Sequence, residues 1–134
     1  MTDEKKFEVH AEITVRLTKQ DVDDIMVSAL EGGICYWCDR VTVEDQYLGK
    51  YASEQISRGG TLKVHVTEPF DEQDTEWYEL DIEKFIQGFR LWLENGGDCY
   101  GAVSGDGKVD CGEIDAGCAD AIIQYALFGE VVYG

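Results

Sequence analysis

Apolar and polar residues alternate at the start of the chain, and this pattern predicts a strand over residues 7–17. The apolar face of that strand consists of Phe7, Val9, Ala11, Ile13, Val15 and Leu17. A period of two is typical of a strand that has one face buried and the other in solvent. The same alternation predicts a strand over residues 61–67. Apolar and aromatic residues also favour strands over 34–43 and 77–80, and an edge strand over 130–133.

Helical spacing of apolar residues appears between these strands. Thr18 and Asp21 suit a helix N-terminus, and apolar residues then recur every three or four positions up to residue 30. Asp81 likewise predicts the start of a helix that extends to residue 95, and residues 51–58 predict a short helix. A capping box of Asp110 and Glu113 predicts the start of the last helix.

Glycine pairs follow three of the expected helices, at residues 32–33, 59–60 and 96–97, and we interpret them as helix C-caps. A tight turn is expected at Asp106-Gly107, between Val103 and Val109. Strands and helices alternate without the regular units of a doubly wound sheet. The pattern therefore predicts a small α+β fold, with a mostly antiparallel sheet and about three helices packed on one face. A length of 134 residues predicts a single domain over 1–134.

The charge of the chain is unusual for a packed protein. Apolar residues make up 44% of it, but 28 acidic residues against 11 basic ones give a net charge of −17. Such a chain is unsuited to neutralising phosphates or to binding an anionic membrane through a basic patch, and suited to a basic partner. The charge is uneven: residues 1–67 hold 12 acids and 8 bases (net −4), and residues 68–134 hold 16 acids and 3 bases (net −13).

The densest acidic stretch is residues 68–83, which contain eight carboxylates and no Lys or Arg. Phe70, Trp77 and Tyr78 are interleaved with these acids. One interpretation is a surface whose carboxylates take the place of phosphates in a groove lined with Lys and Arg. The alternative is an ordinary solvated acidic face. The residues expected to bind the partner are Glu68, Asp71, Glu72, Asp74, Glu76, Trp77, Tyr78, Glu79, Asp98, Asp106 and Asp110.

Two segments suggest a metal site, although neither is complete. Cys35 and Cys38 have a spacing that suits zinc, but no second pair of Cys or His supplies the other two ligands. Residues 102–113 resemble the back half of a calcium loop, with Ala102 and Ser104 where the first acidic ligands belong. We expect no metal and no cofactor, and keep a calcium- or zinc-stabilised protein-binding module as the alternative.

No pattern of nucleophilic or phosphate-binding residues is present. The loop at residues 105–108 lacks the first glycine of a P-loop and has Val109 where Ser or Thr would hold magnesium. His10 and His65 lie on the polar faces of predicted strands without an assignable Ser or Cys. We therefore expect no catalytic residues and a protein that is not an enzyme.

The start of the chain has no apolar segment typical of a signal peptide, which predicts a cytoplasmic protein. An odd number of cysteines, five, fits reduced thiols in that compartment. A homodimer through the less charged N-terminal half is a further expectation.

Three stretches carry a resemblance to known proteins: residues 29–39 (ALEGGICYWCD), 91–98 (LWLENGGD) and 122–130 (IIQYALFGE). Together they resemble a group of small, uncharacterised acidic proteins encoded by prophages and conjugative elements of gut Firmicutes. The resemblance implies a mobile-element context, in which small accessory proteins often inhibit host defence, as anti-CRISPR and anti-restriction proteins do. Some of these inhibitors are acidic mimics of DNA. The resulting hypothesis is a non-enzymatic, cytoplasmic inhibitor that binds the basic nucleic-acid groove of a host defence nuclease such as a CRISPR effector.

Overall fold

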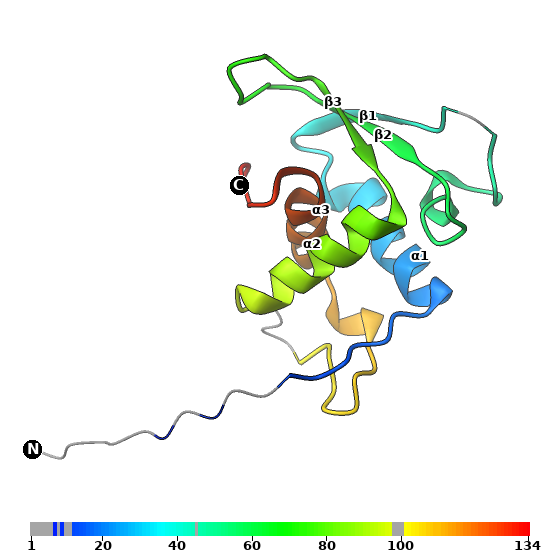
Figure 1. Cartoon of the computed structure of the whole chain (residues 1–134). Coiled ribbons are helices and arrows are strands. Elements are labelled where there is room, and N and C mark those ends of the chain that lie inside the picture. The colour runs from blue at the N-terminus through cyan, green and yellow to red at the C-terminus, as the bar shows by residue number, and fades with distance from the viewer. Residues whose placement is uncertain (1–6, 8, 10–11, 45, 98–100) are drawn as a thin grey trace, which may run out of the picture.

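Three short antiparallel strands form the sheet of the protein. A computed structural model of the chain describes residues 7, 9, 12–44, 46–97 and 101–134. The strands are β1 (Cys38–Thr42), β2 (Leu62–Val66) and β3 (Trp77–Leu80), which lie in the order β1-β2-β3. Buried and partly exposed residues alternate along β2, as the sequence predicts. Figure 1 shows the helices gathered on one side of the sheet, and the predicted α+β fold class is confirmed.

Two of the three α-helices begin where the sequence predicts. Helix α1 (Lys19–Ser28) starts with a capping box, in which the Thr18 hydroxyl accepts from the Asp21 amide at 3.0 Å. Helix α2 (Ile82–Glu94) starts at Asp81, whose carboxylate accepts from the Lys84 amide at 2.9 Å. These caps satisfy amide groups that have no partner within a helix. None of the described helices has the length and apolar character needed to cross a lipid bilayer.

The third helix starts later than predicted. Asp110 caps only a 3₁₀ turn, η3 (Cys111–Glu113), by accepting from the Gly112 amide at 3.0 Å. Helix α3 (Ala116–Phe128) has Asp115 as its N-cap, with the Cys118 amide donating to that carboxylate at 2.8 Å. The prediction from Asp110 was wrong because two nearby Asp residues both suit an N-cap, and local sequence does not rank them.

One hydrophobic core joins the helices to the inner face of the sheet. Its largest fully buried side chains are Trp37, Phe85, Ile25, Met26, Ile34, Ile56, Leu62, Leu80, Ile122 and Ile123. Helices α2 and α3 cross closely at Gly88, where a Cβ atom would lie 2.5 Å from the Ile122 carbonyl oxygen. Burial of this apolar surface is the main force that holds sheet and helices together.

Several local predictions were too long. The segment predicted as a strand over 34–43 forms a turn before β1, and the helix predicted over 51–58 contains only a 3₁₀ turn, η2 (Ala52–Glu54). The glycine pair 32–33 does not cap α1, which continues into a π-helical turn, η1 (Ala29–Gly33). Gly33 serves close packing, because a Cβ atom there would lie 2.6 Å from the Ala116 carbonyl oxygen.

The N-terminal strand predicted over 7–17 is also absent from the described residues, while Glu8, His10 and Ala11 lie outside them. Residues 12–17 are extended but pair with no strand, and the Arg16 amide donates to the Gly107 carbonyl at 2.9 Å. Gly107 belongs to the predicted tight turn, which is present: Val103 and Val109 form an isolated antiparallel bridge. At Gly107, with φ of +83°, a Cβ atom would lie 2.0 Å from the Thr14 carbonyl oxygen, so only glycine permits this contact.

Candidate functional site: the acidic hairpin and the outer sheet face

The acidic stretch forms the connection between β2 and β3, residues 67–76, which we call the acidic hairpin loop (Figure 1). Asp71 organises its backbone: the carboxylate accepts from the Thr75 amide at 2.7 Å, and the carbonyl accepts from the Asp74 amide at 3.2 Å. Hydrogen bonding by Thr75 holds the pKa of Asp71 below its usual value. Asp74 takes a left-handed conformation with φ of +53°. Glu68, Glu72, Asp74 and Glu76 are exposed, so the loop presents carboxylates to solvent.

Aromatic rings support the base of the acidic hairpin loop. Phe70 stacks on Tyr78 with ring centroids 6.2 Å apart, and both rings meet the edge of Phe128, at 5.0 and 4.8 Å. Tyr133 packs against Phe128 and donates its hydroxyl to the Glu68 carbonyl at 2.5 Å. Tyr78 is therefore part of this supporting cluster and half-buried, whereas the sequence predicts that Tyr78, like Trp77, contacts the partner. Edge and offset ring contacts of this kind stabilise packing beyond their buried area.

The C-terminal segment that carries Tyr133 is held by a buried polar network on α3. The Gln124 side-chain oxygen accepts from the amides of Val132 and Tyr133, both at 2.8 Å, and its nitrogen donates to the Tyr133 carbonyl at 3.0 Å. The backbone amides and carbonyl that a strand over 130–133 would pair with the sheet are thus bonded to a side chain. The predicted edge strand does not form there. The Trp37 ring also stacks on Tyr133 at 5.4 Å.

Asp120 lies at the centre of the same network and is only 8% exposed. Its carboxylate accepts from the Trp37 indole at 2.7 Å, the Tyr36 hydroxyl at 2.6 Å and the Gln124 amide at 2.9 Å. Burial and the neighbouring Asp120 raise the pKa of Tyr36 to about 12. Asp120 and Gln124 were not among the residues predicted from the sequence. Two polar residues four positions apart on an otherwise apolar helix were the available signal.

The outer face of the sheet, opposite the core, carries a second group of side chains beside the acidic hairpin loop. Strand register places His65 between Arg40 and Trp77. The rings of His65 and Trp77 lie 4.7 Å apart, and the Arg40 guanidinium lies 5.1 Å from the Trp77 ring centroid. Trp77 remains 39% exposed, so it presents an aromatic surface to solvent next to the acidic loop.

Two carboxylates flank the His65 ring. Nδ1 lies 2.5 Å from Asp39, and Nε2 lies 3.7 Å from Glu76. The hydrogen bond to His65 lowers the pKa of Asp39. The alternating pattern predicts that His65 lies on a polar strand face, but it does not predict the partner, because Asp39 is 26 positions away and only strand pairing brings the two together.

Comparisons of the chain with family models, curated proteins and solved structures find no match. The assignment of a site therefore depends on geometry alone.

The expected binding residues divide into two groups. Glu68, Asp71, Glu72, Asp74, Glu76, Trp77, Tyr78 and Glu79 lie together on the acidic hairpin loop and β3. Asp106 and Asp110 lie in the segment 101–110, which Figure 1 places at the opposite end of the molecule, below α2. Asp98 is outside the described residues. The structure thus brings eight of the expected residues into one region and separates Asp106 and Asp110 from them.

The candidate metal residues bond to their own surroundings. Asp106 accepts from the Ser104 hydroxyl and from the Lys108 amide, as in an ordinary turn. Cys35 is exposed and donates to the Leu30 carbonyl, whereas Cys38 is buried, which raises the pKa of its thiol. Across residues 7, 9, 12–44, 46–97 and 101–134, no group of three or more His, Cys, Asp or Glu is arranged to hold a metal ion.

Proposed function

We propose that this protein is a non-enzymatic, cytoplasmic inhibitor, and that the acidic hairpin loop binds the basic nucleic-acid groove of a host defence nuclease such as a CRISPR effector. The observation that carries the proposal is the support beneath the loop. An aromatic cluster lies beneath its exposed carboxylates, the Asp71 carboxylate accepts from the Thr75 amide, and the Tyr133 hydroxyl donates to the Glu68 carbonyl. A loop that is already ordered loses little conformational entropy when it binds.

The chemistry of the loop suits a groove that normally holds phosphates. Residues 67–76 contain five carboxylates and no Lys or Arg, so the loop itself carries only negative charge. Trp77 and Arg40 lie beside it on the outer sheet face, and Trp and Arg are residue types that often dominate binding energy. Carboxylates would then contact Lys and Arg of the nuclease, and Trp77 would supply the apolar contact.

The loop geometry decides which substitutions test the proposal. Reversing Asp71 or Asp74 would disturb the loop itself, because Asp71 bonds the Thr75 amide and Asp74 has a positive φ. Glu72 and Glu79 are exposed on the loop and on β3, so their charge can be reversed with less risk to the backbone. The test variant is Glu72→Lys with Glu79→Lys. The matched control is Glu31→Lys with Glu113→Lys, two exposed acids elsewhere that give the same change in net charge.

The experiment begins with capture of partners from a Firmicutes lysate on the tagged full chain, followed by a salt gradient and mass spectrometry. We expect an RNA- or DNA-guided nuclease that elutes as salt rises and that duplex DNA displaces. Nuclease assays with the purified target then compare the two variants. The hairpin variant should lose inhibition by at least about tenfold, and the control by much less. Equal behaviour of the two variants, or capture that duplex DNA does not displace, would contradict the proposal.

A further inference from the structure

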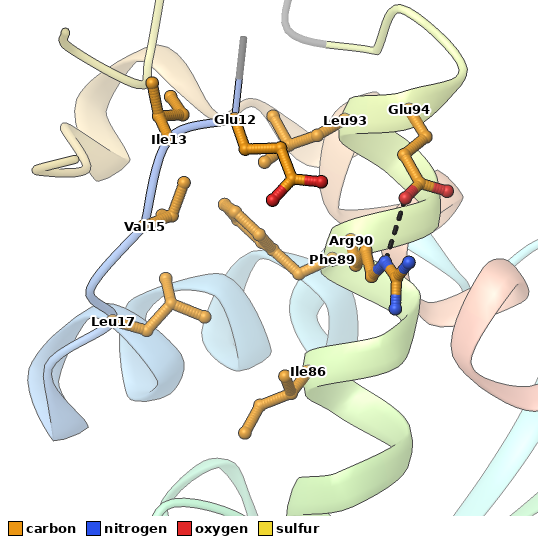
Figure 2. Close-up of a pocket in the computed structure, with 9 residues that line it drawn as sticks. All are labelled: Glu12, Ile13, Val15, Leu17, Ile86, Phe89, Arg90, Leu93 and Glu94. Carbon is orange, nitrogen blue, oxygen red and sulfur yellow. Dashed lines mark hydrogen bonds and ion pairs between the residues drawn. The ribbon is translucent and has the colours of Figure 1, made fainter.

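A groove runs between α2 and residues 12–17, which belong to the N-terminal segment (residues 7–17). It lies on a different part of the molecule from the acidic hairpin loop. Figure 2 shows its two walls: Ile13, Val15 and Leu17 on the extended segment, and Ile86, Phe89 and Leu93 on α2. The groove has a volume of about 660 Å³. Its rim carries Glu12 and an ion pair of 2.8 Å between Arg90 and Glu94.

The groove leaves apolar surface open. Ile13 on one wall is 56% exposed, and Ile86 on the other is 54% exposed. Two residues that precede the groove in sequence are even more open: Phe7 is 90% exposed and Val9 is 87% exposed. Phe7, Val9 and Ile13 belong to one face of the alternating pattern, so this segment has the sequence of a half-buried strand without a surface that buries it.

We propose that the N-terminal segment of a second copy of this chain fills the groove. It would lie extended beside residues 12–17, with its Phe7 and Val9 side chains against Ile86, Phe89 and Leu93. The exchange is reciprocal about a two-fold axis, so that each copy fills the groove of the other. The inference is independent of the proposed inhibitor function.

Dimensions fit this arrangement. Phe7 and Val9 are two residues apart, which corresponds to about 7 Å along a strand. Ile86 and Leu93 are seven residues apart, which corresponds to about 10 Å along a helix. Two adjacent apolar side chains of an extended segment therefore fit within the apolar length of the α2 wall. Residues 12–17 form no strand with the described residues of their own chain, and the Arg16 amide already donates to Gly107, so the incoming backbone would pair along the remaining edge of this segment.

Exposure favours exchange over folding back. Ile13 already forms one wall of the groove, and Phe7 and Val9 of the same chain remain 90% and 87% exposed instead of entering it. The groove is therefore left open to a second chain.

The distribution of charge also favours the N-terminal segment as the place where two copies meet. Residues 1–17 hold four acids and three bases, a net charge of −1 out of −17, so the remaining residues carry −16. Two copies that meet through their N-terminal segments keep most of their like charge apart. Screening by salt should therefore strengthen this dimer, whereas it should weaken binding of the acidic hairpin loop to a basic partner.

Sedimentation equilibrium on the full chain tests the proposal. We expect a concentration-dependent mass that rises from the 15.0 kDa of one chain to twice that value, with tighter association at higher salt. Phe7→Asp and Ile86→Glu should each weaken the dimer by at least about tenfold. The matched control is Gln87→Glu, which adds the same charge at an exposed position next to Ile86 but does not line the groove.

Circular dichroism checks that the variants fold; the exposure of Phe7 and Ile86 leads us to expect that they do. A mass of one chain at all concentrations would overturn the proposal. So would a dimer that Phe7→Asp and Ile86→Glu leave intact, or one that Gln87→Glu weakens equally.

Discussion

The acidic hairpin loop and the N-terminal segment both lie outside the helices, but the protein holds them in different ways. The loop carries strong like charge and is nevertheless well supported, by Phe70, Tyr78 and the hydroxyl of Tyr133. The N-terminal segment is nearly neutral and has apolar residues at alternate positions, and the Arg16 amide holds its backbone by donating to the Gly107 carbonyl. The comparison shows that support comes from complementary surfaces within the fold, not from how apolar a segment is.

The largest expected loss of stability comes from the buried network that holds the C-terminal segment and, through Tyr133, the acidic hairpin loop. Asp120→Ala should lower the free energy of unfolding by about 3 kcal/mol, because a buried indole N–H of Trp37 loses its acceptor. Denaturant unfolding measures the change. Asp120→Asn is the control, since it keeps an oxygen for Trp37, and it should cost clearly less. If both variants cost the same, the charge of Asp120 matters more than its geometry.

The next largest loss of stability is expected where Gly107 contacts the N-terminal segment. Gly107→Ala should cost about 2 kcal/mol, because φ is +83° and the new Cβ would meet the Thr14 carbonyl. Hydrogen exchange at the Arg16 amide should become faster, because residues 14–16 would lose their contact with the turn at Gly107. Gly105→Ala is the control, since a Cβ there meets nothing within 4 Å. Unchanged exchange at Arg16 would show that the segment is held by other contacts.

The smallest effect is a pH dependence of the network that holds the C-terminal segment. The pKa of Tyr36 is about 12 in the folded protein, against about 10 when unfolded. The unfolded chain therefore loses this proton first, so the stabilisation is complete below pH 10 and is lost as pH rises from 10 to 12. Thermal unfolding should show a smaller decrease over that range in Tyr36→Phe than in the original chain. Parallel curves for the two proteins would contradict the assignment.

Local sequence was sufficient where one segment contains all the interactions that decide its structure. The capping box of Thr18 and Asp21, the Asp81 cap and the strand at residues 77–80 all appear as predicted. Local sequence was insufficient where two residues suit the same structural role, or where residues from distant segments form one feature. The choice between Asp110 and Asp115 as the cap of α3 depends on how that helix packs, and local preferences do not contain this information.

The candidate site divides in the same way. The sequence located the acidic stretch and its aromatic neighbours, because charge and composition are properties of a segment. It did not separate Tyr78, which supports the loop, from Trp77, which faces solvent beside it. It also joined Asp106 and Asp110 to a loop at the other end of the molecule. Tertiary packing decides which face of a strand is buried and how far apart two segments of the chain lie.

The sequence by itself thus determined the charge of this protein, its α+β class, most helix starts and the position of the acidic stretch. These depend on side chains within a few residues of one another. Tertiary structure alone decided that Gln124 takes the place of an edge strand, that Asp39 meets His65, and that residues 12–17 line a groove. Each of these depends on contacts between residues far apart in the chain, whose free energy exists only after the core has formed.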